Sequence, residues 1–158
     1  MVTCLNGGNI TGTKTIDFQQ AARRHFNDAE LLASHARQAN AGHLYGFAAE
    51  CGVKALLVWK GYPSNPVSGD IVEKRKKFRA HIHELTNNIN MVYTFLDGRG
   101  AAKYLAMIPS IGDFSDWKTE HRYYIDSALP PSVPSWRNAS REIMQMLDQA
   151  MLDDGEKI

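Results

Sequence analysis

The stretch from His43 to Trp59, HLYGFAAECGVKALLVW, constrains this chain most, because it is a helix-length apolar run with only two charged residues. These are Glu50 and Lys54, and a separation of four residues places both on one face of a helix. A helix that is apolar nearly all round belongs in the middle of a helical protein. A carboxylate and an ammonium group placed there must pair with each other or with groups from neighbouring helices. The sequence therefore predicts a polar spot inside an all-α core.

Length and composition fit one domain of ordinary charge. The chain has 158 residues and a formal net charge of +1, so overall charge gives no strong attraction to nucleic acid or membrane. The two cysteines, Cys4 and Cys51, lack the spacing of a disulfide framework or a metal site. The start of the chain has no secretory-signal pattern, and no long uncharged apolar span occurs elsewhere. We expect a soluble protein of the cytoplasm with no membrane partner.

Apolar residues that recur at steps of three and four predict four main helices. They cover about residues 15–38, 43–60, 82–96 and 136–150. One or two short helical segments are expected between them, over residues 101–108 and after a capping Ser115. No segment shows the alternation of a strand. We therefore predict an antiparallel up-and-down bundle with the second helix at its centre. Residues 15–158 form its single domain, preceded by a flexible segment, 1–14.

Three sequence elements resemble the HEPN domains. They are FAAECGVKALL in the second helix, HIHEL at residues 81–85, and a tryptophan followed by Arg-Tyr, at Trp117, Arg122 and Tyr123. The resemblance covers roughly residues 15–150. It implies an antiparallel helical bundle, usually a homodimer, of a bacterial toxin-antitoxin or phage-defence type or a companion of a nucleotidyltransferase. Many HEPN domains cleave RNA with an arginine followed, after four to six residues, by a histidine.

The order of those two residues differs in the late segment of this chain, EHRYYID, where His121 precedes Arg122. Two pairs with five intervening residues occur elsewhere, Arg37 with His43 and Arg75 with His81. These four residues are the catalytic candidates. Pairs of this kind also arise by chance in a chain with eighteen basic residues and six histidines.

The dense basic cluster of Arg75, Lys76, Lys77 and Arg79 is the candidate for nucleic-acid binding. Together with His81 and His83 it could hold phosphates. The alternative is a solvated helix entry whose like charges keep it exposed.

The charges of the second helix also allow two interpretations. Glu50 and Lys54 could hold a ligand, or they could form an internal ion pair that bonds to Arg122 or Tyr123. Four aromatic residues also allow two interpretations, since they could stack on nucleic-acid bases or serve only as packing. They are Trp117, Tyr123, Tyr124 and Trp136.

Two functions of different classes follow. The first is an RNA- or nucleotide-associated HEPN-like protein, with metal-independent RNA cleavage as its activity. That reaction needs a base for the 2′-hydroxyl proton and a cation for the developing charge, so we expect no metal and no cofactor. The alternative is a noncatalytic helical interaction module, acting as a partner subunit of a nucleotidyltransferase or of a larger defence enzyme. A homodimer, or a complex with an antitoxin, is expected from the resemblance.

Overall fold

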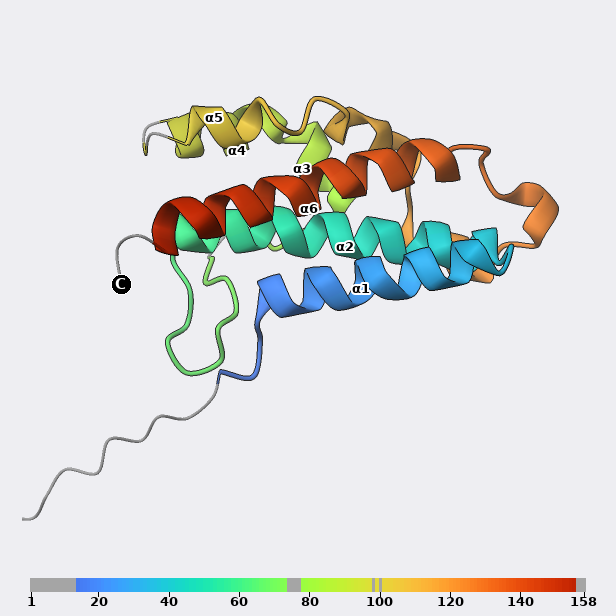
Figure 1. Cartoon of the computed structure of the whole chain (residues 1–158), viewed down its shortest axis with the longest axis horizontal. Coiled ribbons are helices and arrows are strands. Elements are labelled where there is room, and N and C mark those ends of the chain that lie inside the picture. The colour runs from blue at the N-terminus through green and yellow to red at the C-terminus, as the bar shows by residue number, and fades with distance from the viewer. Residues whose placement is uncertain (1–13, 74–77, 98, 100, 156–158) are drawn as a thin grey trace, which may run out of the picture.

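The computed structural model describes residues 14–73, 78–97, 99 and 101–155. Within these ranges the chain forms α-helices and short 3-10 helices but no β-strand (Figure 1). A single antiparallel bridge joins Ser64 and Ile71 in the loop after the second helix. The all-α prediction is confirmed. The expected flexible start lies almost entirely outside the described residues.

Helices α1 (Phe18–Ser34) and α2 (Gln38–Trp59) are joined by a tight turn and run antiparallel, as predicted. The side chain of Asp17 begins α1 by accepting a hydrogen bond from a backbone amide of its first turn, and Ala36 reverses the chain with a φ of 57°. The first helix therefore ends earlier than expected. The second begins before residue 43, because the turn is completed by residue 37.

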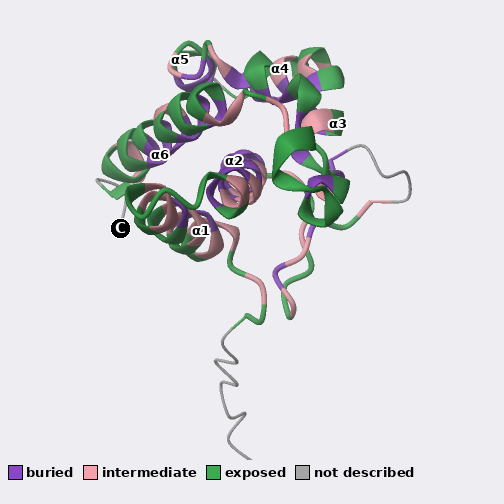
Figure 2. Ribbon diagram, turned by 90° about the vertical axis from the view of Figure 1, so that its right-hand side faces the viewer, coloured by how far each residue is buried: buried purple, intermediate pink, exposed green. Residues whose placement is uncertain are grey.

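Helix α2 lies at the centre of the molecule, as predicted (Figure 2). Small residues on α2 allow its neighbours to approach closely. A Cβ atom added at Gly52 would lie 2.3 Å from Ile143, and one added at Gly42 would lie 2.8 Å from Val133. Both contacts are made to helix α6 (Val133–Gly155). The spacing of glycine and alanine on α2 thus sets how tightly α6 packs against it.

Helix α6 runs in the same direction as α2, and the prediction of a fully up-and-down bundle is wrong in this respect. Gly42 near the start of α2 faces Trp136 near the start of α6. At the other end Lys60 forms an ion pair with Asp154, with 3.6 Å between nitrogen and oxygen. The connection over residues 106–132 explains this direction, because it returns the chain to the start of α2 before α6 begins (Figure 1).

The expected third helix consists of two helices, α3 (Ile82–Asn87) and α4 (Ile89–Asp97). The break is at Asn88. Its backbone amide donates to the carbonyl of Glu84 and so caps α3, and its own carbonyl accepts hydrogen bonds from amides in the first turn of α4.

Between α4 and α6 the described residues form only short helices. These are α5 (Ala102–Leu105) and three 3-10 helices, η1 (Ile111–Asp116), η2 (Thr119–Tyr123) and η3 (Asp126–Ala128). Ser115 lies inside η1 and does not cap a helix, contrary to expectation.

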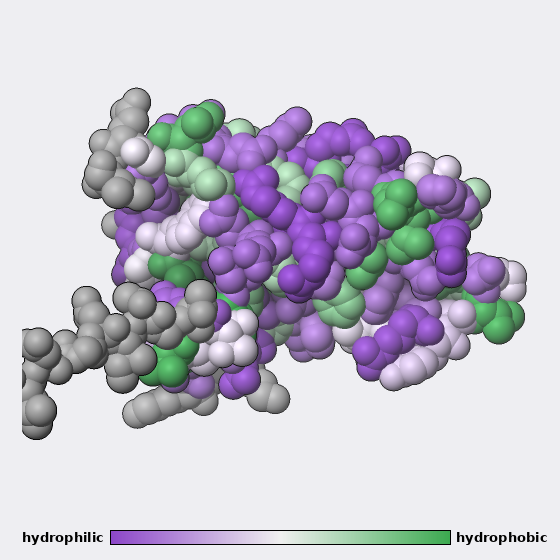
Figure 3. All heavy atoms as spheres, turned by 60° about the horizontal axis from the view of Figure 1, so that its bottom comes forward, coloured by the Kyte–Doolittle hydropathy of each residue, from purple (hydrophilic) through white to green (hydrophobic). Residues whose placement is uncertain are grey.

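The face crossed by α1 is mainly hydrophilic where the structure describes it (Figure 3). Hydrophobic side chains on that face form separate patches. The apolar side chains of α1, α2, α3, α5, α6 and η1 meet instead in one buried core around α2.

Candidate functional site: a histidine cluster beside a buried ion pair

The two charges of α2 form the predicted ion pair. Lys54 Nζ lies 2.7 Å from Glu50 Oε1, and their side chains are only 9% and 12% exposed. The ammonium group also lies 5.8 Å from the centre of the Phe18 ring. Pairing satisfies both charges at a depth where an isolated charge would be strongly unfavourable. One oxygen of Glu50 remains for another partner.

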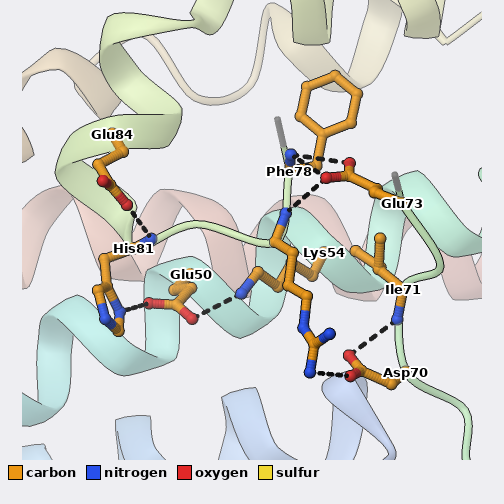
Figure 4. Close-up of polar contacts among 9 residues, drawn as sticks. Glu50, Lys54, Asp70, Ile71, Glu73, Phe78, His81 and Glu84 are labelled. Atoms are coloured by element: carbon orange, nitrogen blue, oxygen red, sulfur yellow. Dashed lines mark hydrogen bonds and ion pairs between the residues drawn. The ribbon is translucent and has the colours of Figure 1, made fainter. Parts of the chain in front are cut away.

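That partner is His81, at the entry to α3 (Figure 4). Its Nδ1 lies 3.1 Å from Glu50 Oε2, and its side chain is 47% exposed. The backbone amide of His81 donates to Glu84, which fixes the first turn of α3. A carboxylate that accepts from Nδ1 sets the tautomer of a neutral imidazole and leaves Nε2 as an acceptor. His81 therefore presents a basic nitrogen on a half-exposed ring.

A second carboxylate holds the segment that delivers His81. Glu73 accepts hydrogen bonds from the backbone amides of Phe78, at 2.8 and 3.1 Å, and of Arg79, at 3.3 Å (Figure 4). The hydroxyl of Tyr62 donates to the same carboxylate at 2.6 Å. The buried ring of Phe78 packs edge-on against Tyr62. Glu73 thus anchors the chain just before His81, a role that the sequence analysis missed.

Trp117 packs against α2 at Gly46, one helical turn before Glu50. It is fully buried, and its indole nitrogen donates to the backbone carbonyl of Gly42 at 3.1 Å. A Cβ atom added at Gly46 would lie 2.0 Å from the Trp117 ring, so the indole needs a glycine there. Of the two interpretations of Trp117, stacking on bases or packing, its full burial favours packing, and nothing local in the sequence indicates its contact with α2.

Three histidine rings surround Trp117. Ring centroids lie 5.3 Å from it for His43, 6.3 Å for His83 and 6.5 Å for His81. The rings of His81 and His83 are nearly parallel, with centroids 6.3 Å apart. The histidine cluster, defined as His43, His81 and His83, therefore brings together two predicted catalytic residues and one that had been placed only in the basic cluster.

The tautomers of two of these rings follow from burial of one ring nitrogen. Within the described part of the chain, Nδ1 of His43 and Nδ1 of His83 are buried without a hydrogen-bond partner. A buried N–H without an acceptor is rare in proteins, so the bare lone pair is favoured there and the ring proton lies on Nε2. Burial, with a further contribution from the charge of Arg122, holds the pKa of His43 below its usual value of 6.5. With these tautomers, Nε2 of His43 and of His83 can donate a hydrogen bond, whereas Nε2 of His81 can accept one.

Arg37 does not join His43, and the prediction of that catalytic pair is wrong. Arg37 is the exposed residue before α2 and lines a cleft of about 630 Å³ with Pro130 and Pro131 of the later connection and Pro134 of α6. His43 faces Trp117 instead.

The basic cluster can be followed only in part. Arg75, Lys76 and Lys77 lie outside the described residues, and so does the proposed pairing of Arg75 with His81. Arg79 is exposed and forms an ion pair with Asp70 at 3.1 Å.

Arg122 and Tyr123 do not bond to the ion pair, contrary to expectation. Both are exposed, and the guanidinium of Arg122 lies 4.7 Å from the centre of the Tyr123 ring. In η2 it is His121 that turns inward, where its ring stacks on Trp136 at 5.8 Å. The second partner of Glu50 thus comes from the entry to α3 and not from η2.

No family model, curated protein or solved structure matches this chain. Over the described residues, no set of three histidine, cysteine or acidic side chains is arranged to share a metal ion. No helix in the same ranges combines the length and apolar character needed to cross a membrane.

Proposed function

We propose that this chain is an RNA-directed protein of HEPN-like type, from a toxin-antitoxin or phage-defence system, that cleaves RNA at the histidine cluster without a metal. The observation that carries the proposal is the hydrogen bond between Glu50 and a half-exposed His81. A histidine with a purely structural role usually has both ring nitrogens hydrogen-bonded or its ring buried. In His81 only Nδ1 is held, by Glu50, and about half of the side chain is exposed to solvent.

The proposed reaction uses His81 as general base. Its Nε2 takes the proton of a ribose 2′-hydroxyl, the 2′ oxygen attacks the adjacent phosphorus, and the 5′ oxygen leaves with a proton from solvent. The imidazolium that forms is stabilised by Glu50, as the carboxylate of a catalytic triad stabilises its histidine. The Nε2–H groups of His43 and His83 donate to phosphate oxygens, and Arg122 adds positive charge nearby. Lys54 acts indirectly, because it holds Glu50 in place.

The test is cleavage of varied single-stranded RNAs in the presence of a chelator. We expect His81→Ala to lower the rate by about 100-fold or more, which is the usual contribution of general acid–base catalysis. His35→Ala is the matched control, because His35 is the C-cap residue of α1 and its ring bonds to Leu31 and Ser34 of its own turn. Cleavage that persists unchanged in His81→Ala would contradict the assignment.

The noncatalytic interaction module remains the second candidate, and exposed apolar side chains favour it. Ile125 is 72% exposed and Leu152 is 70% exposed, so both offer apolar surface to a partner. Such side chains suit a homodimer interface or a complex with an antitoxin or nucleotidyltransferase. Wild-type protein that cuts none of the RNAs but forms a dimer or a stable complex would favour this candidate. Sedimentation and co-purification measure both.

A further inference from the structure

Three consecutive apolar residues of the connection before α6 lie open to solvent. Tyr123 is 73% exposed, Tyr124 44% and Ile125 72%. A tyrosine ring carries a large apolar surface and is usually buried for much of its area. The exposed ring of Tyr123 therefore contributes little to the core, and it leaves a face open to another planar group.

One face of the Tyr123 ring is covered by a neighbouring side chain. The guanidinium of Arg122 lies 4.7 Å from its centre. The neighbouring Tyr124 packs against the ring of His121 with centroids 5.1 Å apart, and His121 stacks on the buried Trp136. An edge-on contact and a stacked contact thus connect Tyr124, the neighbour of Tyr123, to the core. The ordering cost of binding is reduced when the contacting side chains are already held in place.

The same segment borders the histidine cluster. It follows Trp117 directly in the chain, and η2 packs on α2. The charge of Arg122 reaches His43 closely enough to lower the pKa of its imidazole. A ligand lying on Tyr123 would therefore extend toward the site where His81 acts.

We propose that Tyr123, backed by Arg122, is a stacking subsite for an unpaired base of single-stranded RNA. The inference rests on the proposed function and specifies its substrate class. Only an unpaired base can offer its full π-face to a side chain, because the bases of a duplex are covered by their neighbours.

The experiment measures binding apart from cleavage. The probe is a fluorescein-labelled, single-stranded 2′-O-methyl oligoribonucleotide of mixed sequence, which lacks the nucleophilic hydroxyl, and the duplex it forms with its complement. Fluorescence anisotropy gives the Kd for each. We expect tighter binding of the single strand, a Kd raised about tenfold by Tyr123→Ala, and little change in Tyr123→Phe. Ile125→Ala is the matched control, because it removes an equally exposed apolar side chain without a π-face.

The outcomes separate the inference from the proposed function. An unchanged Kd in Tyr123→Ala overturns the inference. If RNA is still cleaved in a way that depends on His81, the proposed function is nevertheless supported. Equal losses in Tyr123→Ala and Ile125→Ala overturn it in favour of an apolar surface for a protein partner. The expected binding pattern without any RNA cleavage supports the inference and overturns the cleavage. Wild-type protein that binds neither probe overturns both.

Discussion

The carboxylate of Glu50 joins two groups of different origin, since one oxygen lies 2.7 Å from Lys54 Nζ and the other 3.1 Å from Nδ1 of His81. The lysine is one helical turn away, and the histidine arrives from a segment 31 residues later. One side of the carboxylate is neutralised inside the protein. The other orients a ring that reaches solvent. This arrangement connects the buried ion pair to the proposed chemistry.

We expect Glu50→Ala to lower the free energy of unfolding by roughly 3 kcal/mol, because it leaves the ammonium of Lys54 buried without a counter-charge. Urea unfolding followed by circular dichroism measures the change. The double variant Glu50→Leu with Lys54→Met removes both charges, and we expect it to be nearly as stable as wild type. It should nevertheless fail to cleave RNA, because His81 is no longer oriented. A stable Glu50→Ala protein would show that the pair is not buried in solution.

Gly46→Ala should destabilise the protein by about 3 kcal/mol or prevent folding, because the new methyl group would overlap the Trp117 ring. Neither helix backbone nor a fully buried indole can move aside easily. Gly112→Ala is the control, since nothing lies within 4 Å of a Cβ atom at that position, and we expect a change within about 0.5 kcal/mol. Thermal unfolding and tryptophan fluorescence measure both. Equal stability of the two variants would place Trp117 away from α2.

Glu73→Ala should loosen the chain before His81, because the amides of Phe78 and Arg79 lose their acceptor. Hydrogen bonds to a charged group contribute about 1.5–3 kcal/mol, so we expect a loss of roughly 2 kcal/mol. Hydrogen exchange should accelerate at these two amides while the amides in the middle of α2 stay protected. Exchange that is unchanged at residues 78 and 79 would show that Glu73 does not hold this segment.

The ion pair of Glu30 with Arg137 should add to the acid sensitivity of the protein. The hydrogen bonds from Arg137, at 2.6 and 2.7 Å, lower the pKa of Glu30 from 4.5 to about 2. Because the folded-state pKa is depressed, this stabilisation is complete above pH 4.5 and is lost as the pH falls toward 2.

We therefore expect Arg137→Gln to show a shallower loss of unfolding free energy across that pH range than wild type. Urea unfolding at a series of pH values measures the slope. Arg24→Gln serves as the control, because Arg24 is an exposed arginine of α1 that does not bond to Glu30. A slope that Arg137→Gln leaves unaltered would show that the pair is broken in solution.

The amino-acid sequence by itself determined the helical class, the central place of α2 and the pairing of Glu50 with Lys54. Each depends on relations within a turn or two of helix, where fixed geometry converts spacing into position. The predictions from the sequence were wrong where competing turns or contacts between distant segments decide the structure. The split at Asn88 depends on which of two competing turns is capped, and apolar spacing alone does not distinguish one helix from two in series.

Only the tertiary structure decided the histidine cluster and the direction of α6. Trp117 donates to a carbonyl 75 residues away, and His81 meets a carboxylate from another helix. Contacts of this kind depend on the path of the loops that connect the helices. Many such paths are compatible with the same pattern of apolar residues. Small residues at Gly42, Gly46 and Gly52 select among them, because each admits one large neighbour, and that neighbour is known only once the helices are packed.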